Sequence, residues 1–162
     1  MNNQHTTQTL NYYNQNAAQF SDSTQSLDFA SVQDKFLSFL QPQAHILDFG
    51  CGPGRDTKYF LSHGCSTDAI DGSEEFCRIA SEYAGIPVKQ MLFQEMNASE
   101  EYDGIWACSS ILHSTYDDLK DILKKLARAL KKEGILYASF KYGDFEGMRN
   151  GRYFIDMTED KL

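Results

Sequence analysis

Three glycines at alternate positions mark the part of the sequence best suited to hold a ligand. Gly50, Gly52 and Gly54 follow an apolar run at residues 46–47, and a helical pattern begins after them and stops at Gly64. Glycine lets the backbone take positive φ values and leaves no Cβ in the path of a ligand. The start of the helix adds free N–H groups and the positive end of its dipole. The sequence therefore predicts a strand, a ligand-binding turn and a helix.

The run Asp48-Phe-Gly50-Cys-Gly52-Pro-Gly54 resembles the first motif of the class I S-adenosylmethionine-dependent methyltransferases, D/E-x-G-x-G-x-G. The competing interpretation is the dinucleotide fingerprint G-x-G-x-x-G, which requires glycine at the position of Arg55. The resemblance implies S-adenosylmethionine as the cofactor. The residues of this loop that it assigns to cofactor binding are Asp48, Gly50, Cys51, Gly52, Gly54 and Arg55.

A carboxylate follows the glycine loop at the spacing of about 20 residues expected for a ribose-binding acid. Asp71 ends a short strand-like stretch, and Ser73 is a good N-cap for the helix after it. An acid at the tip of a second strand can accept both ribose hydroxyls of an adenosine. Nicotinamide cofactors carry the same ribose, so Asp71 does not separate the two cofactor classes. We predict that Asp71, Gly72 and Ser73 contact the cofactor.

Two later turns also resemble cofactor-binding segments of this family. The turn after the predicted third strand borders the adenine in the family, where Phe93 or Met96 would supply apolar surface. Gln94 or Glu95 would bond the exocyclic amine, although the family usually has Asp at the position of Gln94. The end of the fourth strand, at Ala107 and Cys108, is implied to lie beside the amino and sulfonium end of the cofactor.

Other residues are candidates for chemistry or for contacts with a second substrate. His113 follows the fourth strand and is the candidate general base, with a hydrogen-bonded packing role as the alternative. Tyr13 lies in an opening that resembles the lid of a branch of these methyltransferases, and plain packing is the alternative there. The sequence predicts a long loop at residues 141–151, beyond the fifth strand, where ligands of open α/β sheets bind. The acceptor-contacting candidates there are Tyr142, Arg149, Arg152 and Tyr153.

Alternating strands and helices predict an α/β fold with a doubly wound, Rossmann-like parallel sheet in the order 3-2-1-4-5 and helices at the N-terminus. We expect residues 1–24 to form a mobile N-terminus and lid helix, and residues 25–162 to form an S-adenosylmethionine-binding methyltransferase domain. The family usually completes its sheet with a final β-hairpin, which the sequence predicts to be missing. The domain would then be incomplete at its C-terminus, and the fifth strand would offer an open edge for a homodimer.

Composition restricts the choice of partners and compartment. The 162 residues correspond to one domain, and their net charge of −8 argues against nucleic acid as a partner. No apolar run approaches the roughly 18 residues of a membrane helix, and the polar N-terminus does not resemble a signal peptide. The four cysteines show no C-x-x-C pair, which favours reduced thiols in the cytoplasm and no metal site.

The sequence therefore predicts transfer of the methyl group of S-adenosylmethionine to an unidentified small-molecule acceptor by in-line displacement. The resemblance is greatest to small-molecule enzymes of the tellurite-resistance-like branch. Because a sulfonium is already a good leaving group, the protein mainly has to align the acceptor. A non-catalytic binder of S-adenosylmethionine or S-adenosylhomocysteine is the first alternative. An NAD(P)-dependent oxidoreductase is the second, and Arg55 argues against it.

Overall fold

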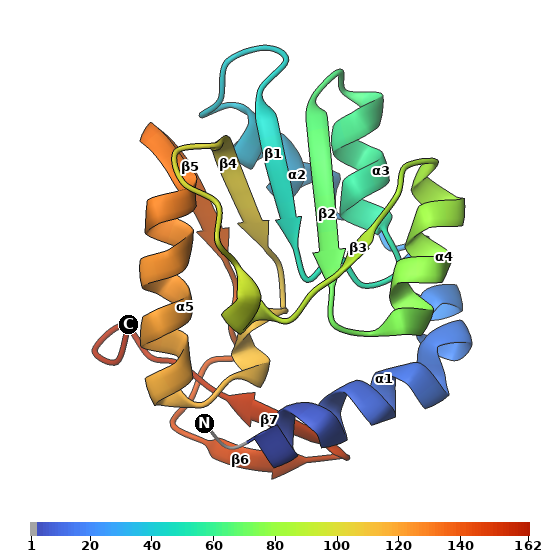
Figure 1. Cartoon of the computed structure of the whole chain (residues 1–162), viewed down its shortest axis with the longest axis vertical. Coiled ribbons are helices and arrows are strands. Elements are labelled where there is room, and N and C mark those ends of the chain that lie inside the picture. The colour runs from blue at the N-terminus through green and yellow to red at the C-terminus, as the bar shows by residue number, and fades with distance from the viewer. Residues whose placement is uncertain (1–2) are drawn as a thin grey trace.

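A computed structural model describes residues 3–162, and its centre is a parallel sheet of five strands (Figure 1). The strand order is β3-β2-β1-β4-β5, and every neighbouring pair is parallel, which confirms the predicted topology. The carboxyl ends of the strands point toward the same edge, where a long helix and a hairpin lie across them (Figure 1). The strands are β1 (His45–Phe49), β2 (Ser66–Asp71), β3 (Lys89–Gln90), β4 (Tyr102–Ala107) and β5 (Leu130–Ala138).

Helices connect the strands, and side chains at their first turns satisfy free backbone N–H groups. The Ser73 hydroxyl accepts a hydrogen bond from the N–H of Phe76, and the Thr115 hydroxyl accepts one from Asp118. The helices are α1 (Asn3–Thr24), α2 (Ala30–Leu37), α3 (Arg55–Ser62), α4 (Glu74–Ala84) and α5 (Tyr116–Ala129), with short 3₁₀ turns at Phe93–Glu95 and Ile111–His113. Helix α1 extends through the described part of residues 1–24, the segment expected to hold a mobile N-terminus and a lid helix.

The core has two sides because successive strand residues point to opposite faces of the sheet. Leu47 and Ile105 pack toward α5 through Ile122. Ile46 and Trp106, their sequence neighbours, pack toward the other face. There they meet apolar side chains of α2 and α3. Apolar residues on both faces make β1 and β4 the centre of the sheet, and this fixes the edge at which their loops meet.

The prediction of a loop over residues 141–151 is partly wrong. Strand β6 (Glu146–Arg149) pairs with β7 (Arg152–Ile155) in an antiparallel hairpin. Its turn is Asn150-Gly151, and both residues have positive φ values, 50° and 77°. Asn-Gly is the preferred pair for such two-residue turns, so the sequence did contain the signal for this hairpin. The hairpin forms a sheet of its own and leaves β5 at the edge of the parallel sheet.

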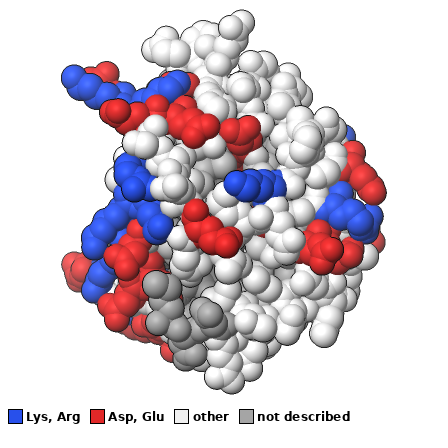
Figure 2. Space-filling view, in the orientation of Figure 1, with Lys and Arg blue, Asp and Glu red and all other residues white. Residues whose placement is uncertain are grey.

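Charged side chains of both signs lie next to one another over α5, at the left of the face in Figure 2. Lys120 pairs with Asp117 and Lys124 with Asp121, each at helical spacing. Such an arrangement is typical of a solvated helix face. No helix within residues 3–162 has the combination of length and apolar character needed to cross a membrane.

Candidate active site

The glycine loop joins β1 to α3, and its three glycines have different surroundings. All three have positive φ values: 81° at Gly50, 53° at Gly52 and 89° at Gly54. A Cβ on Gly50 would lie 2.4 Å from Cβ of Ser110, and one on Gly54 would lie 3.0 Å from Cα of Ala80. A Cβ on Gly52 would meet nothing within 4 Å. The outer glycines are therefore required by packing, whereas the central one opens onto free space.

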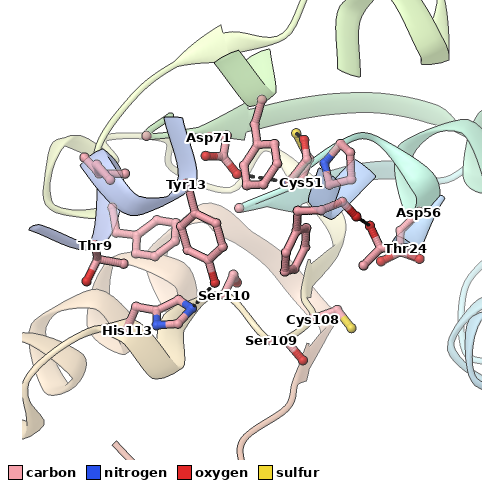
Figure 3. A pocket seen from close by; sticks show the side chains of 18 of the residues that line it. Thr9, Tyr13, Thr24, Cys51, Asp56, Asp71, Cys108, Ser109, Ser110 and His113 are labelled. Carbon is pink, nitrogen blue, oxygen red and sulfur yellow. Dashed lines mark hydrogen bonds between the residues drawn. The ribbon is translucent and has the colours of Figure 1, made fainter. Parts of the chain in front are cut away.

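Asp71 ends β2 beside this open point, as Figure 3 shows. One carboxylate oxygen accepts a hydrogen bond from the N–H of Gly52 at 2.9 Å, and the other accepts one from Ser73 at 2.8 Å. Burial raises the pKa of Asp71 to about 6, although these backbone donors oppose the rise. The carboxylate therefore holds the loop in shape and retains lone pairs for a ligand.

A cavity of about 330 Å³ lies against the loop, lined by residues of α1 and of the turns that follow the strands. Most of the residues predicted to bind a cofactor lie around it, although they come from separate parts of the chain. Figure 3 shows several of their side chains pointing into this space. The predicted residues that line it are Tyr13, Gly50, Cys51, Gly52, Arg55, Asp71, Gly72, Phe93, Gln94, Cys108 and His113.

Five predicted cofactor residues do not line this cavity: Asp48, Gly54, Ser73, Glu95 and Ala107. Asp48 lies behind the loop, where the Thr57 hydroxyl donates to it at 2.6 Å and burial raises its pKa well above the usual value. Glu95 accepts a hydrogen bond from the backbone of Leu92. Ala107 is fully buried. These residues support the loops around the cavity from behind.

One wall of the cavity contains an ion pair that is already satisfied. Arg55 donates to both carboxylate oxygens of Asp56, at 2.8 and 3.0 Å. The same carboxylate accepts hydrogen bonds from Gln33 and from the indole of Trp106. The guanidinium of Arg55 also lies 4.6 Å from the ring centre of Phe29. Arg55 therefore fixes α2 and α3 against the loop.

Helix α1 covers the cavity, and sequence reasoning identified Tyr13 alone among its lining residues. The side chain of Leu10 packs so closely on Gly72 that a Cβ there would lie 2.8 Å from it. The residues missed on α1 are Thr6, Thr9, Leu10, Phe20 and Thr24. Thr6, Thr9, Leu10 and Tyr13 follow helical spacing, and Phe20 and Thr24 continue the same face after an interval of seven residues. Extending the helical pattern in both directions from Tyr13 would therefore have found them.

Tyr13 and His113 meet at the far end of the cavity (Figure 3). The Tyr13 hydroxyl lies 2.8 Å from Nε2 of His113, and Nδ1 lies 2.6 Å from the carbonyl oxygen of Tyr153. A carbonyl can only accept, so Nδ1 donates and Nε2 accepts the Tyr13 proton. Burial lowers the pKa of His113 to about 4, so its ring is neutral at pH 7. Both ring nitrogens of His113 are therefore engaged within the protein.

A second cavity, of about 360 Å³, adjoins the first and lies next to β7. The two share Tyr13, Phe20, Phe29, Ser109 and His113 as lining residues. The other residues around the second cavity are Leu112, Tyr137, Ser139, Phe140, Lys141, Arg152 and Phe154. A ligand in one cavity would therefore lie against the same side chains as a ligand in the other.

Of the four predicted acceptor-contacting residues, Arg152 lines this second cavity. Tyr142 is 77% exposed, and Arg149 is paired with Asp156 at 2.8 Å. The Tyr153 hydroxyl donates to Glu146 at 2.9 Å. Neighbouring strand residues point to opposite faces, which separates Tyr153 from Arg152. Arg149 lies directly opposite Arg152 in the hairpin and differs from it by its ion pair with Asp156. Within the described residues 3–162, His, Cys, Asp and Glu form no group of three or more suited to a metal ion.

A parallel sheet in this order, with a glycine turn and an acid at the ends of its first two strands, is the Rossmann-like arrangement that class I S-adenosylmethionine-dependent methyltransferases share with dinucleotide-binding proteins. Residues 46–134 match the family model described as "Methyltransferase domain", and the chain belongs to this family.

Curated relatives are similar over part of their length. A malonyl acyl-carrier protein O-methyltransferase of Enterobacter lignolyticus is 29% identical over 99 residues, which is 57% of this chain and 37% of the relative. The enzyme of the same name from Salmonella typhimurium is 26% identical over 118 residues, which is 70% of this chain and 45% of the relative. The chain thus spans less than half of either relative.

Among solved structures, the fold is similar to that of a Burkholderia thailandensis 1,6-didemethyltoxoflavin-N1-methyltransferase. The TM-score is 0.65 at 24% sequence identity, covering 81% of this chain and 61% of that one. That structure contains 1,6-didemethyltoxoflavin and S-adenosylhomocysteine. At this level of identity the likeness shows a common fold.

Proposed function

We propose that this protein transfers the methyl group of S-adenosylmethionine to a small-molecule acceptor. The observation that carries the proposal is the open face of Gly52, which lies beside the Asp71 carboxylate in a cavity at the carboxyl edge of the sheet. A side chain at Gly52 would occupy the space in which a ligand would contact the loop. Ligands of open α/β sheets bind at this edge.

The first cavity is suited to an adenosyl group with a charged tail. We assign the ribose hydroxyls to Asp71, and we assign the adenine to the side of the cavity formed by Phe93 and Gln94. Phe93 is held for this role because its ring stacks on that of Phe49, with centroids 4.5 Å apart. Helix α1 covers the site and, through Tyr13, helps to exclude water. We therefore propose that α1 acts as the lid expected within residues 1–24.

The second cavity is the proposed acceptor site, because it shares Tyr13 and His113 with the first. Bound S-adenosylmethionine supplies an electrophilic methyl group on a sulfonium. The protein has to hold the acceptor atom in line with that methyl group, and alignment of this kind accounts for much of the rate enhancement. A base is required only where the acceptor atom carries a proton. His113 reaches the acceptor side only through the Tyr13 hydroxyl, and its pKa of about 4 makes it a weak base for that step.

Calorimetric titration tests the cofactor assignment. We expect S-adenosylmethionine and S-adenosylhomocysteine to bind and NADH not to bind, because Arg55 stands where a dinucleotide loop needs glycine. Asp71→Asn should weaken binding by about 1.5–3 kcal/mol, the scale of a hydrogen bond to a charged group. Asp121→Asn, on the exposed face of α5, is the matched control. Binding of NADH alone would reject the proposal.

Methyl transfer itself is tested with isotopically labelled S-adenosylmethionine and a panel of metabolites. A labelled product formed from the panel would support the enzyme. Binding of the cofactor with no product from any member would favour the alternative of a non-catalytic binder. The names of the curated relatives add acyl-carrier-protein-bound malonyl groups to the panel. The structural neighbour adds heteroaromatic nitrogen acceptors.

Two further assignments complete the proposal. Among the described strands, β5 pairs with β4 alone, so we propose that two copies associate through this edge. Light scattering at high concentration would show a dimer, and a stable monomer would contradict it. The four cysteines are free, which supports a reducing compartment such as the cytoplasm. Fractionation of cells that produce the protein tests that location.

A further inference from the structure

The two cavities differ in the charges that line them. The first contains the acids Asp56 and Asp71 together with Arg55. The described residues around the second include two cations, Lys141 and Arg152, and no acid. This contrast stands out in a chain whose net charge is −8. The second cavity therefore offers a positive potential to whatever enters it.

Arg152 differs from the other arginines near the site because it lacks an acidic partner among the described residues. Arg149, on the same hairpin, pairs with Asp156 at 2.8 Å, and Arg55 pairs with Asp56 at the same distance. The Nε–H of Arg152 is buried and has no hydrogen-bond partner among residues 3–162. A buried donor without a partner is costly, so such a group in a cavity wall points to a missing ligand atom.

The side chains around Arg152 orient its guanidinium but do not neutralise its positive charge. Its guanidinium lies 4.5 Å from the ring centre of Tyr12 and 5.1 Å from that of Phe154. One terminal nitrogen donates to the Tyr13 hydroxyl at 3.3 Å. Aromatic faces attract a cation but leave its charge uncompensated. The fork of the guanidinium is thus held in place beside the boundary between the two cavities.

Lys141 adds a second positive charge to the same region. Its ammonium lies 5.9 Å from the Phe154 ring, which Arg152 also contacts. Both cations lower the pKa of His113, so both charges act on one point of the cavity. The rest of the wall is largely aromatic, formed by the rings of Phe20, Phe29, Tyr137, Phe140 and Phe154.

We propose that the second cavity selects an acceptor with an apolar ring and a carboxylate, and that Arg152 binds the carboxylate with assistance from Lys141. This inference rests on the proposed function and names the chemical class of its acceptor. A planar carboxylate matches the guanidinium fork with two parallel hydrogen bonds. A cavity of about 150 Å³ is enough for benzene, so about 360 Å³ holds a substituted ring.

The test compares benzoate with benzamide, two ligands of the same shape and different charge. Each is titrated into protein saturated with S-adenosylhomocysteine, and into protein without it, while binding is followed by calorimetry, a readout that does not depend on the Arg152 side chain. We expect benzoate to bind at least about tenfold more tightly than benzamide, the scale of a charge-assisted hydrogen bond. Arg152→Gln should abolish this preference, and Arg152→Lys should keep part of it.

Two controls separate this inference from the cofactor assignment. Arg128→Gln makes the same chemical change on the exposed face of α5 and should leave both ligands unaffected. The affinity for S-adenosylhomocysteine should stay unchanged in Arg152→Gln, because Arg152 lies outside the first cavity. If that affinity falls further than in Tyr13→Phe, which removes the hydroxyl that Arg152 contacts, Arg152 binds the carboxylate of the cofactor, and the acceptor proposal is rejected.

Other outcomes would also overturn the proposal. Equal affinity for benzoate and benzamide, or no detectable binding of benzoate, would show that the cavity does not select carboxylates. A preference that survives Arg152→Gln would remove Arg152 from the site. If that variant does not fold, Lys141→Gln provides the test, because Lys141 forms no ion pair within the described part of the chain. Lys141→Gln should reduce the preference for benzoate over benzamide several-fold, and an unchanged preference would reject the proposal.

Discussion

The hydroxyl of Tyr13 lies 2.8 Å from Nε2 of His113, although the two residues are 100 positions apart in the sequence. Tyr13 belongs to α1 and His113 to the turn after β4. The contact ties the helix that covers the glycine loop to the turn that lines both cavities. Arg152 of the hairpin donates to the same hydroxyl, so three separate elements meet at one atom.

A double-mutant cycle should show that Tyr13 and His113 are energetically coupled. Tyr13→Phe keeps the ring contacts with Phe20 and Phe76 and removes only the hydroxyl. We expect Tyr13→Phe, His113→Gln and the double variant to give a coupling of about 1 kcal/mol in the free energy of unfolding, the usual value of one hydrogen bond. Denaturant titration measures it. Strictly additive effects would contradict the contact.

The neutral state of His113 should make its contribution to stability depend on pH. The pKa of this group is lowered from about 6.5 to about 4 by burial. Below pH 6.5 the unfolded imidazole takes up a proton that the folded one does not, so acid favours unfolding. The stability contributed by His113 is therefore complete above pH 6.5 and is lost as the pH falls toward about 4.

The raised pKa of the Asp71 carboxyl makes acid stabilise the folded state over part of this range. The pH dependence of the wild type alone therefore does not isolate the contribution of His113. The difference in the free energy of unfolding between the wild type and His113→Gln should shrink as the pH falls from 6.5 toward about 4. A constant difference would contradict it. NMR titration of the ring provides a direct measurement of the pKa.

Cofactor affinity should depend on the ionisation of Asp71. Because the pKa of this carboxyl is raised to about 6, mild acid protonates it in the folded protein and removes an acceptor. We expect the Kd for S-adenosylhomocysteine to rise as the pH falls below about 6, by up to about tenfold per pH unit. Calorimetry across this range measures the effect. Asp71→Asn should bind weakly with little pH dependence, and an equally steep dependence in this variant would assign the titration to another group.

The glycines of the loop should separate folding from binding. Gly50→Ala places a Cβ against Ser110, so we expect a loss of stability. Gly52→Ala introduces left-handed strain of about 1–2 kcal/mol and puts a methyl group into the open cavity. We therefore expect Gly52→Ala to fold and to lose affinity for S-adenosylhomocysteine.

Gly64→Ala is the matched control for this comparison. Gly64 has a φ of 79° and is equally free of neighbours, yet it lies away from both cavities. Gly64→Ala should lower the temperature of thermal unfolding through the same left-handed strain, and calorimetry should show no loss of affinity for S-adenosylhomocysteine. If Gly52→Ala binds the ligand as well as Gly64→Ala does, the open face of the loop is not the binding surface.

Much of the framework followed from local sequence patterns. The alternation of strands and helices, the glycine spacing after β1 and the acid at the end of β2 predicted the topology and the centre of the first cavity. Parallel topology places all carboxyl ends at one edge, so residues in the turns after β1, β2 and β4 must meet. Asn150-Gly151 carried the hairpin signal as well, but a loop was predicted there.

The tertiary structure decided which polar groups are satisfied and which remain free. Local sequence gives Arg149 and Arg152 the same character, yet one is paired with Asp156 and the other lines a cavity without an acidic partner in the described chain. The sequence likewise offers His113 as a base, whereas burial and the contacts with Tyr13 and Tyr153 determine its tautomer and its low pKa. Burial and pairing depend on segments distant in the sequence, so local patterns cannot specify them.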